Sequence, residues 1–356
     1  MSPVRFVLTT VLTLLLLLAG SAGQCVIADD DVAPLSLVSD RAAVCLEIPR
    51  IEANWLQFQR SQLMTRLKQF APIERLLAGA GFQKLAQVEE HVRRTTGKTL
   101  SEQLLRTCSE ALVVAIYIPE GRSPQGVLIA QARDADALRQ TLQAWSLLEP
   151  RHESQVKEHR GHPYTRRAKS ATSTEVVYYA TFDRTVALSD QERLIHEVIE
   201  LHASGVRKAV VAADGARGLV DAPLYPANRS RLPGDAVAYL FVNTRMWDRV
   251  VDEAIAKSPD ARWIQPAVRQ IAAVAAALRL NDEVVIDLVV DVTGGPLPSG
   301  WRAFVAGTVG GGDWSRRIPR DAILAVSSRM EIAPLIQGWL AISTDARTDE
   351  IGRAHV

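Results

Sequence analysis

The spacing of apolar and polar positions divides most of the chain into short predicted strands and amphipathic helices. Val44, Leu46 and Ile48 occupy every second position, as expected for a strand with one face in the core. Similar runs predict strands at 42–48, 111–118, 126–130, 155–159, 164–167, 176–181, 186–188, 236–242 and 283–292. Short connectors such as Arg160-Gly161 separate neighbouring runs and predict antiparallel hairpins.

Apolar residues three or four positions apart predict helices between these strands. Leu138, Leu142 and Trp145 form one such stripe, and Asp134 stands where a helix N-cap is expected. The same spacing predicts helices at 51–70, 72–96, 191–204, 246–255 and 263–280. Together, the strands and helices indicate an α+β fold with antiparallel sheets and packed helices.

One motif occurs three times along the chain. An aliphatic residue, two spacers and an aspartate precede an apolar run, then an arginine, then a helical stretch with a tryptophan. The aspartates are Asp40, Asp235 and Asp321, and the tryptophans are Trp55, Trp247 and Trp339. We expect the aspartates to cap turns and the tryptophans to anchor cores, so the motif predicts related subdomains.

The motif copies and the segments between them predict the domain organisation. It comprises a signal peptide (1–23), a flexible entry (24–36), a first α+β unit (37–204), a linker (205–231), a second α+β unit (232–317), the start of a third, truncated unit (318–349) and a non-native tail (350–356). The tail matches the translation of a sequencing-library adapter. We therefore expect the natural protein to contain further sheet after Leu340.

The N-terminus is typical of a bacterial secretory signal. Arg5 precedes an apolar run at 6–19, and small residues at 20–23 provide a cleavage site. The run is shorter than a bilayer-spanning helix, which needs about 20 apolar residues. We expect export to the periplasm or beyond. Contact with a membrane is expected only if the leader is uncleaved or Cys25 is acylated, and Gln24 occupies the position where acylation needs a small residue.

Composition narrows the classes of partner. Hydrophobic residues make up 47% of the chain and the formal net charge is +1, so the chain is globular and carries no long-range field to recruit nucleic acid. Outside the cytoplasm Cys45 and Cys108 could form a disulfide. Their positions in a predicted strand and at the end of a predicted helix favour two buried thiols instead.

The histidines are the best candidates for a metal site. His159 and His162 flank the Arg160-Gly161 turn and could converge on one ion, but no second ligand cluster accompanies them. Arg160 would also place a positive charge beside the metal, so we expect no metal and no cofactor. Glu192, His196 and Glu200 fall on one helical face, where they could coordinate or titrate, or could form a solvated row of charge pairs.

The same predicted hairpin is rich in positive charge. The candidate anion-binding residues are Arg160, Arg166, Arg167 and Lys169. They could meet an anionic headgroup or glycan, or they could protect a sheet edge from aggregation. No segment has the spacing of a nucleophile elbow or a phosphate loop, because Pro124 follows Ser123 and the glycines at 307–312 lack a following lysine.

The segments 37–55, 232–247 and 318–339, with 127–145 and the Arg160-Gly161 hairpin, resemble the bacterial domain-of-unknown-function family 3352. The resemblance implies an exported or membrane-anchored protein and implies no catalytic residues. We expect a non-catalytic scaffold that binds an envelope protein or a glycan. The alternative is an extracytoplasmic hydrolase whose site is assembled from acidic and histidine residues.

Overall fold

The computed structural model describes residues 33–61, 64–65, 89–90, 92–94, 97–148, 152–170, 172–173, 176–206, 217–257, 269–280 and 284–292. The predicted signal peptide, Cys25, the third motif copy and the tail lie outside these residues. The described residues fall into two compact units: residues up to Met246 together with Val274–Val289, and Trp247–Ala273 together with residues from Val290.

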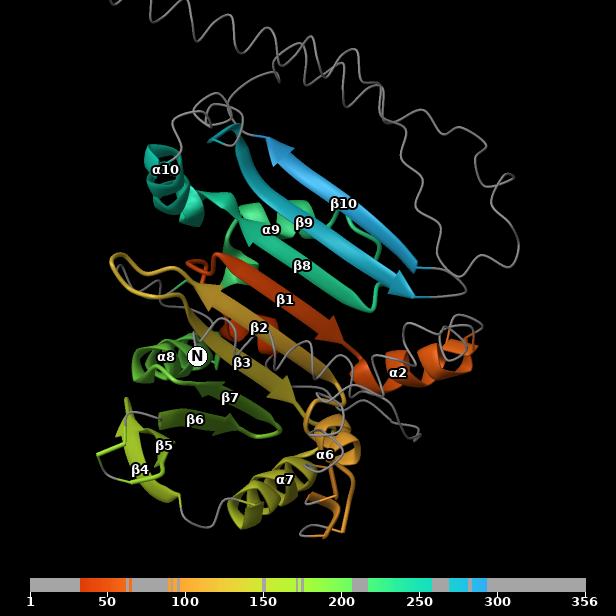
Figure 1. Cartoon of the computed structure of the whole chain (residues 1–356), viewed down its shortest axis with the longest axis vertical. Coiled ribbons are helices and arrows are strands. Elements are labelled where there is room, and N and C mark those ends of the chain that lie inside the picture. Colours follow the sequence, from red (N-terminus) through yellow and green to blue (C-terminus); the bar gives the residue numbers. More distant parts are fainter. Residues whose placement is uncertain are drawn as a thin grey trace, which may run out of the picture. The chain divides into compact units, whose positions relative to one another are not determined.

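An antiparallel sheet of ten strands dominates the fold (Figure 1). The strands are β1 Val44–Pro49, β2 Ala111–Tyr117, β3 Gln125–Gln131, β4 Glu153–His159, β5 His162–Ala168, β6 Val176–Phe182, β7 Thr185–Ser189, β8 Ala238–Asn243, β9 Ile271–Leu280 and β10 Val284–Val292. Their order across the sheet is β10-β9-β8-β1-β2-β3-β7-β6-β5-β4. The predicted hairpins β2–β3, β4–β5 and β6–β7 are confirmed by antiparallel pairing.

Helices pack against this sheet, and the predicted α+β class is confirmed. The α-helices are α2 Ile51–Arg60, α6 Leu100–Thr107, α7 Ala135–Leu148, α8 Glu192–Val206, α9 Leu224–Arg229 and α10 Asp248–Lys257; the 3-10 helices are η1 Pro34–Leu37, η2 Leu219–Asp221 and η3 Thr244–Trp247. Asp134 caps α7 as predicted, since its Oδ1 accepts a hydrogen bond from the Ala137 N–H at 2.6 Å. Among the described residues no helix is long and apolar enough to cross a membrane.

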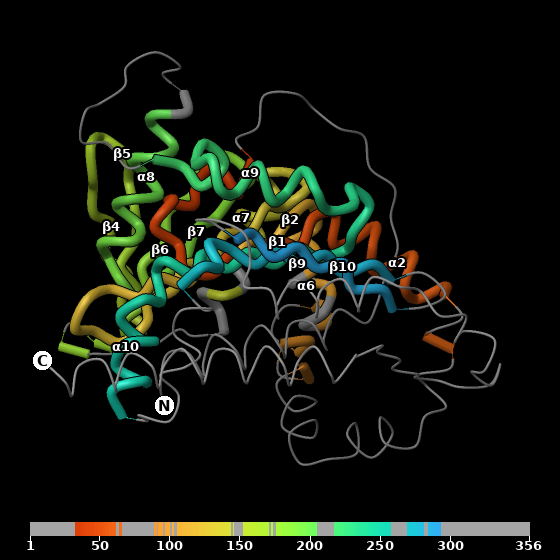
Figure 2. The backbone as a smooth tube through the Cα atoms, turned by 90° about the horizontal axis from the view of Figure 1, so that it is seen from above, coloured from red at the N-terminus to blue at the C-terminus, as the bar shows by residue number. Residues whose placement is uncertain are grey.

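The central strands are buried on both faces. Leu112, Val113, Val114 and Ala115 follow one another along β2, and each is nearly inaccessible to solvent. One face of the central strands carries a core cluster in which residues of α2, α6 and α7 pack, including Trp55. Helix α8 contacts β3, β6 and β7, and its tube runs beside β6 in Figure 2.

The strands of the first two motif copies are direct neighbours. Strand β1 pairs with β8, with Leu46 opposite Leu240, so one sheet runs across the predicted boundary between the first two units. The described part of the predicted linker, residues 217–231, contains η2 and α9. Leu219 and Tyr225 in these helices are buried, and Ser39 forms a bridge with Gly218. This part of the linker is therefore structured and tied to the start of the fold.

The prediction of a helix at 263–280 is wrong for its second half. Residues 271–280 form β9, in which Ala273, Ala275 and Ala277 are buried at every second position. Alanine favours helix in isolation, but small side chains also suit a closely covered strand. Trp55 lies in the core as expected, whereas Trp247 is half-buried and Trp339 lies outside the described residues.

Candidate functional site

The tip of the β4–β5 hairpin is shaped by a two-residue turn. Arg160 and Gly161 both have positive φ, 50° and 81°, which is the backbone of a type I′ turn. His159 and His162 lie directly opposite each other on either side of this turn. The predicted hairpin therefore brings the two histidines to one end of the sheet, next to α8.

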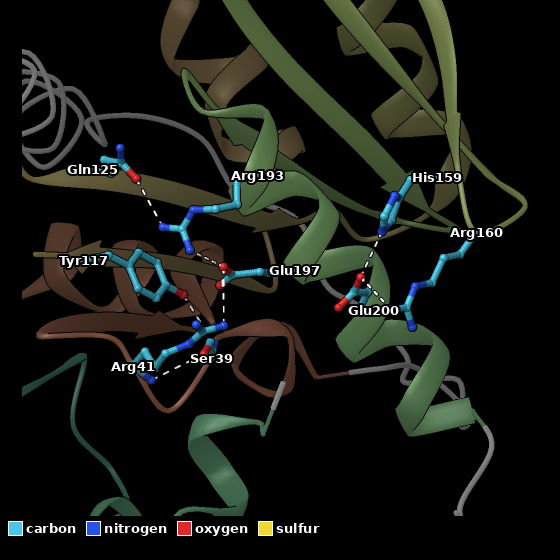
Figure 3. Close-up of polar contacts among 9 residues, drawn as sticks. All are labelled: Ser39, Arg41, Tyr117, Gln125, His159, Arg160, Arg193, Glu197 and Glu200. Carbon is cyan, nitrogen blue, oxygen red and sulfur yellow. Dashed lines mark hydrogen bonds and ion pairs between the residues drawn. The ribbon is translucent and has the colours of Figure 1, made fainter. Parts of the chain in front are cut away.

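Helix α8 presents a row of polar side chains to this hairpin. Glu192 accepts hydrogen bonds from the Tyr164 hydroxyl at 2.6 Å and from Lys157 Nζ at 2.7 Å. About two helical turns further along, Glu200 Oε1 lies 3.0 Å from His159 Nε2 and 3.0 Å from Arg160 Nη2 (Figure 3). The predicted row of Glu192, His196 and Glu200 thus faces the hairpin and forms charge pairs with it.

Aromatic ring contacts fill the space between the two carboxylates. The rings of His159 and His196 are stacked, with centroids 3.9 Å apart and planes 2° apart. The Tyr164 ring meets His196 edge-on at 5.1 Å. A second histidine pair lies nearer the C-terminal end of α8, where the ring centroids of His162 and His202 are 5.9 Å apart. The Phe182 ring contacts both members of this second pair: its centroid lies 4.6 Å from that of His162 and 4.4 Å from that of His202.

Burial shifts the protonation of this cluster. Burial and the neighbouring His159 lower the pKa of His196, although Glu192 and Glu200 oppose the shift. Burial and His162 likewise lower the pKa of His202. Burial and the hydrogen bond to Glu192 raise the pKa of Tyr164 to about 12. Burial alone would raise the pKa of Glu192, but the hydrogen bonds from Lys157 and Tyr164 outweigh it and lower that pKa.

The two candidate metal ligands make separate contacts. His159 Nε2 is directed to Glu200, while His162 Nε2 lies 3.1 Å from the backbone oxygen of Thr181. Within the part of the chain that the structure describes, no group of three or more histidine, cysteine, aspartate or glutamate side chains could hold a metal ion. The arrangement can exchange protons and bind through charge pairs, and its carboxylates are already matched by cations.

The four candidate anion-binding residues do not share one exposed surface. Arg167 is only 4% exposed, and its guanidinium lies 5.0 Å from the centre of the Trp145 ring. Arg160 pairs with Glu200 at the turn. Arg166 is half-buried and Lys169 is exposed. Successive residues of a strand point to opposite faces, so Arg166 and Arg167 cannot contribute to the same patch.

A second polar network lies on another side of α8, and none of the patterns in the sequence predicted it. Glu197 Oε1 accepts a hydrogen bond from Arg193 at 2.5 Å and lies 3.4 Å from Arg41 (Figure 3). Arg193 also donates to Gln125 at 3.3 Å. The Arg193–Glu197 spacing of four residues on a helix was the available signal, but Arg41 and Gln125 come from distant segments.

A small cavity lies between β1, β8 and α9. It encloses about 250 Å³ of empty space, part of which is open to solvent, and Glu47, Tyr225, Arg229 and Tyr239 are among its lining residues. Arg229 lies over the Tyr239 ring, 3.4 Å from its centre. Burial raises the pKa of Glu47, while Arg229 and the Tyr225 hydroxyl partly offset that effect.

Strand β10 carries an aliphatic stripe on one face. Val284, Ile286 and Leu288 alternate along the strand and are 50%, 67% and 62% exposed. Asp287 points to the opposite face, where it pairs with Arg279 at 2.9 Å. In the described sheet β10 is an edge strand. Large aliphatic side chains with this much exposure on a long edge strand are unusual, because such edges invite pairing with other chains.

Comparison with known proteins gives weak structural similarity. No protein-family model and no curated protein sequence matches the chain. The structure of crystal form I of TP0453 is similar at 12% identity, with a TM-score of 0.39 over 78% of this chain and 86% of that chain. Crystal form III of TP0453 is similar at 14% identity, with a TM-score of 0.37 over 80% of this chain and 91% of that chain.

Proposed function

We propose that the chain is an exported, non-catalytic protein of the bacterial envelope that binds another protein through the edge strand β10. The exposed stripe of Val284, Ile286 and Leu288 carries this proposal. The N-terminal signal pattern supports export, and the resemblance to family 3352 supports the same assignment. Burying such a stripe would remove three aliphatic side chains from water, a gain of roughly 25 cal/mol per Å² of apolar surface.

The chemistry of β10 favours a protein over a glycan or a nucleic acid. Sugars and phosphates are recognised by polar and charged groups, whereas this face of β10 presents aliphatic side chains, and the Arg279–Asp287 pair lies on the other face. An extended segment can add to a sheet edge through its backbone while its alternate side chains contact the stripe. The proposed partner is therefore an envelope protein with an extended aliphatic segment.

Site-specific photocrosslinking in cells tests this assignment. We expect a probe at Ile286 to give one adduct of defined mass with an envelope protein. A probe at Val250, which is 36% exposed on α10, is the matched control and should give no such adduct. With the purified partner, Ile286→Lys should weaken binding by roughly tenfold or more, since it places a charge in an apolar contact. Unchanged affinity would contradict the proposal.

Export is tested separately by fractionation. We expect the chain in the extracytoplasmic fraction, and we expect Leu15→Arg, which interrupts the apolar run of the leader, to retain it in the cytoplasm. Thr10→Ser, a conservative change within the same run, is the control. A chain that remains cytoplasmic with its native leader would overturn the assignment to the envelope.

The hydrolase alternative has one specific observation in its favour. The fold brings His159, His196 and Glu200 together, and such groups can act as an acid and a base. Activity profiling with esters, amides and glycosides, together with metal analysis of the purified chain, tests this alternative. Turnover that is lost on His159→Ala, or stoichiometric zinc, would establish the hydrolase over the binding protein.

A further inference from the structure

The contact between the β4–β5 hairpin and α8 is built largely from histidines. The chain has seven histidines, and four of them, His159, His162, His196 and His202, meet in this one interface. Each pair joins one histidine near the hairpin turn to one on α8. Histidine is the side chain whose ordinary pKa lies closest to neutral pH, so the charge of this interface changes between mildly acidic and neutral solution.

The geometry of the first pair requires that at least one ring be uncharged. Two imidazoles in parallel at 3.9 Å attract when neutral, but two imidazolium cations at that separation repel strongly in a partly buried site. The His159 ring has a carboxylate partner, because its Nε2 lies 3.0 Å from Glu200 Oε1. A proton added to His196 Nε2 has no such partner, since this atom is buried without a hydrogen bond.

The charged groups around this pair do not compensate for a second proton. Glu192 faces Lys157 from β4 and the Tyr164 hydroxyl from β5, and Glu200 faces Arg160 from the turn. The Tyr178 side chain on β6 also lies near Tyr164. Two carboxylates thus stand against two fixed cations before any histidine is protonated. Each proton added to the histidines therefore increases the net positive charge of this cluster.

Protonation of the second pair, His162 and His202, also adds positive charge that no neighbouring carboxylate in these ring contacts balances. His202 contacts His162 and the Phe182 ring, and these contacts contain no carboxylate. The negative end of the helix dipole at the end of α8 favours some positive charge on His202, so the first pair is the more sensitive of the two.

We propose that the His159–His196 and His162–His202 pairs form an acid-sensitive clasp that holds the tip of the β4–β5 hairpin against α8 and releases it in mildly acidic solution. This inference does not depend on the proposed function. When the hairpin tip detaches, all four rings reach water and can be protonated independently. The released state therefore binds more protons than the closed state, and acidification favours release.

The sign and the pH window follow from the lowered pKa values. An ordinary histidine titrates near 6.5, and His196 and His202 titrate below that value in the closed state. Well above pH 6.5, His196 and His202 are neutral in both the closed and the released state, and the clasp is closed. The stabilisation is lost as the pH falls from 6.5 through the lowered pKa values, because only the released state gains the protons.

Hydrogen exchange measured by mass spectrometry on the full chain tests the clasp. Exchange is compared at about pH 7.5 and about pH 5.5 after correction for the intrinsic pH dependence of amide exchange. We expect peptides from β4, β5 and the second half of α8 to lose roughly fivefold or more protection at the lower pH, while β2 and β3 keep theirs. Equal protection of the hairpin at both pH values would overturn the proposal.

The double variant His196→Phe, His202→Phe separates charge from packing. Phenylalanine keeps a ring at both positions and removes the titration, so we expect the acid-dependent loss of protection to disappear. His152→Gln is the matched control, because His152 directly precedes β4 but belongs to neither pair, and this variant should respond to pH as the native chain does. A double variant that still loses protection at the lower pH would contradict the clasp.

If the double variant does not fold, two measurements that do not use it still test the clasp: one on a single variant and one on the native chain. His196→Gln alone removes the charge of the first pair and should reduce the acid response at least in part. In the native chain, NMR titration of the imidazole resonances should show His196 titrating below an ordinary histidine, together with chemical-shift changes in hairpin amides. Hairpin shifts that do not follow the histidine titration would refute the clasp.

Discussion

At the scale of single residues, hydroxyl groups make the turn contacts that the sequence analysis assigned to aspartates. In the first motif copy Ser39 Oγ accepts a hydrogen bond from the Arg41 N–H at 3.3 Å. In the second copy the Tyr239 hydroxyl accepts from the Ala236 N–H at 3.2 Å and donates to the Pro233 carbonyl at 2.7 Å. In these two copies nearby hydroxyl groups, rather than the aspartates, make the hydrogen bonds of the turn.

Removing the Tyr239 hydroxyl should destabilise the fold. Tyr239 is only 3% exposed, so Tyr239→Phe leaves the buried Ala236 N–H without its acceptor. The expected loss in the free energy of unfolding is on the order of 1–3 kcal/mol, measured by urea denaturation. Tyr178→Phe is the matched control, because Tyr178 is half-buried in β6, and it should change stability by less than about 0.5 kcal/mol. Equal effects of the two substitutions would contradict this account.

The two described cysteines should be unreactive in the native protein. Cys45 and Cys108 are buried free thiols. Burial raises the pKa of Cys108 to about 12, and burial together with Glu47 raises that of Cys45. Because the thiolate is the reactive form, iodoacetamide at about pH 8 should modify neither residue until denaturant is added. The measurement uses a Cys25→Ser chain, and rapid labelling of the native protein would show that the thiols are accessible.

At the scale of elements, local patterns predict the hairpins well and β9 poorly. The β4–β5 hairpin follows from its Arg160-Gly161 turn, because glycine accepts the positive φ that a type I′ turn requires. Strand β9 is different, since its alanine-rich sequence also suits a helix. Its conformation is decided by its place between β8 and β10, where the backbone hydrogen bonds of neighbouring strands are satisfied.

Replacing the turn glycine should strain the hairpin. Gly161 has a φ of 81° and open space around the position of a Cβ, so Gly161→Ala tests the backbone conformation alone. We expect a loss of about 1–2 kcal/mol in the free energy of unfolding. Gly234→Ala is the matched control, because Gly234 has similar open space and no positive φ. A Gly161→Ala chain as stable as the Gly234→Ala chain would argue against the type I′ turn.

At the scale of the whole molecule, one sheet joins segments that the sequence separates into two units. Strand β1 lies between β2 and β8, so its hydrogen bonds are divided between the predicted first and second units. The Leu219 N–H also donates to the Val38 carbonyl at 2.7 Å, which ties η2 to the start of the fold. The two predicted units are therefore joined by the backbone hydrogen bonds of β1 and should unfold together.

A fragment that ends before β8 should be less stable than the longer chain. Residues 33–206 keep β1 but lose its partner β8, which exposes the backbone groups of β1 and invites aggregation. We expect a broad, low-temperature unfolding transition by circular dichroism and oligomers in size-exclusion chromatography. A fragment of residues 33–257 retains β8 and is the matched comparison. Fragments with the same unfolding midpoint would support the predicted boundary at 205–231.

The candidate site could be predicted from the sequence only in part. The row of Glu192, His196 and Glu200 and the turn between His159 and His162 are both visible in the sequence, because helix and hairpin periodicity are local. Their meeting depends on how α8 lies against β4 and β5. The contacts of Glu197 with Arg41, and of Arg167 with Trp145, were likewise out of reach, since each joins segments from different elements.

The sequence by itself determined the α+β class, the three hairpins, the capped start of α7 and most element positions, because each depends on neighbouring residues. The tertiary structure decided that β1 and β8 share one sheet, that residues 271–280 form a strand and that four histidines meet at one interface. The physical reason is that these features depend on pairing and burial between segments far apart in the chain, which local propensity does not encode.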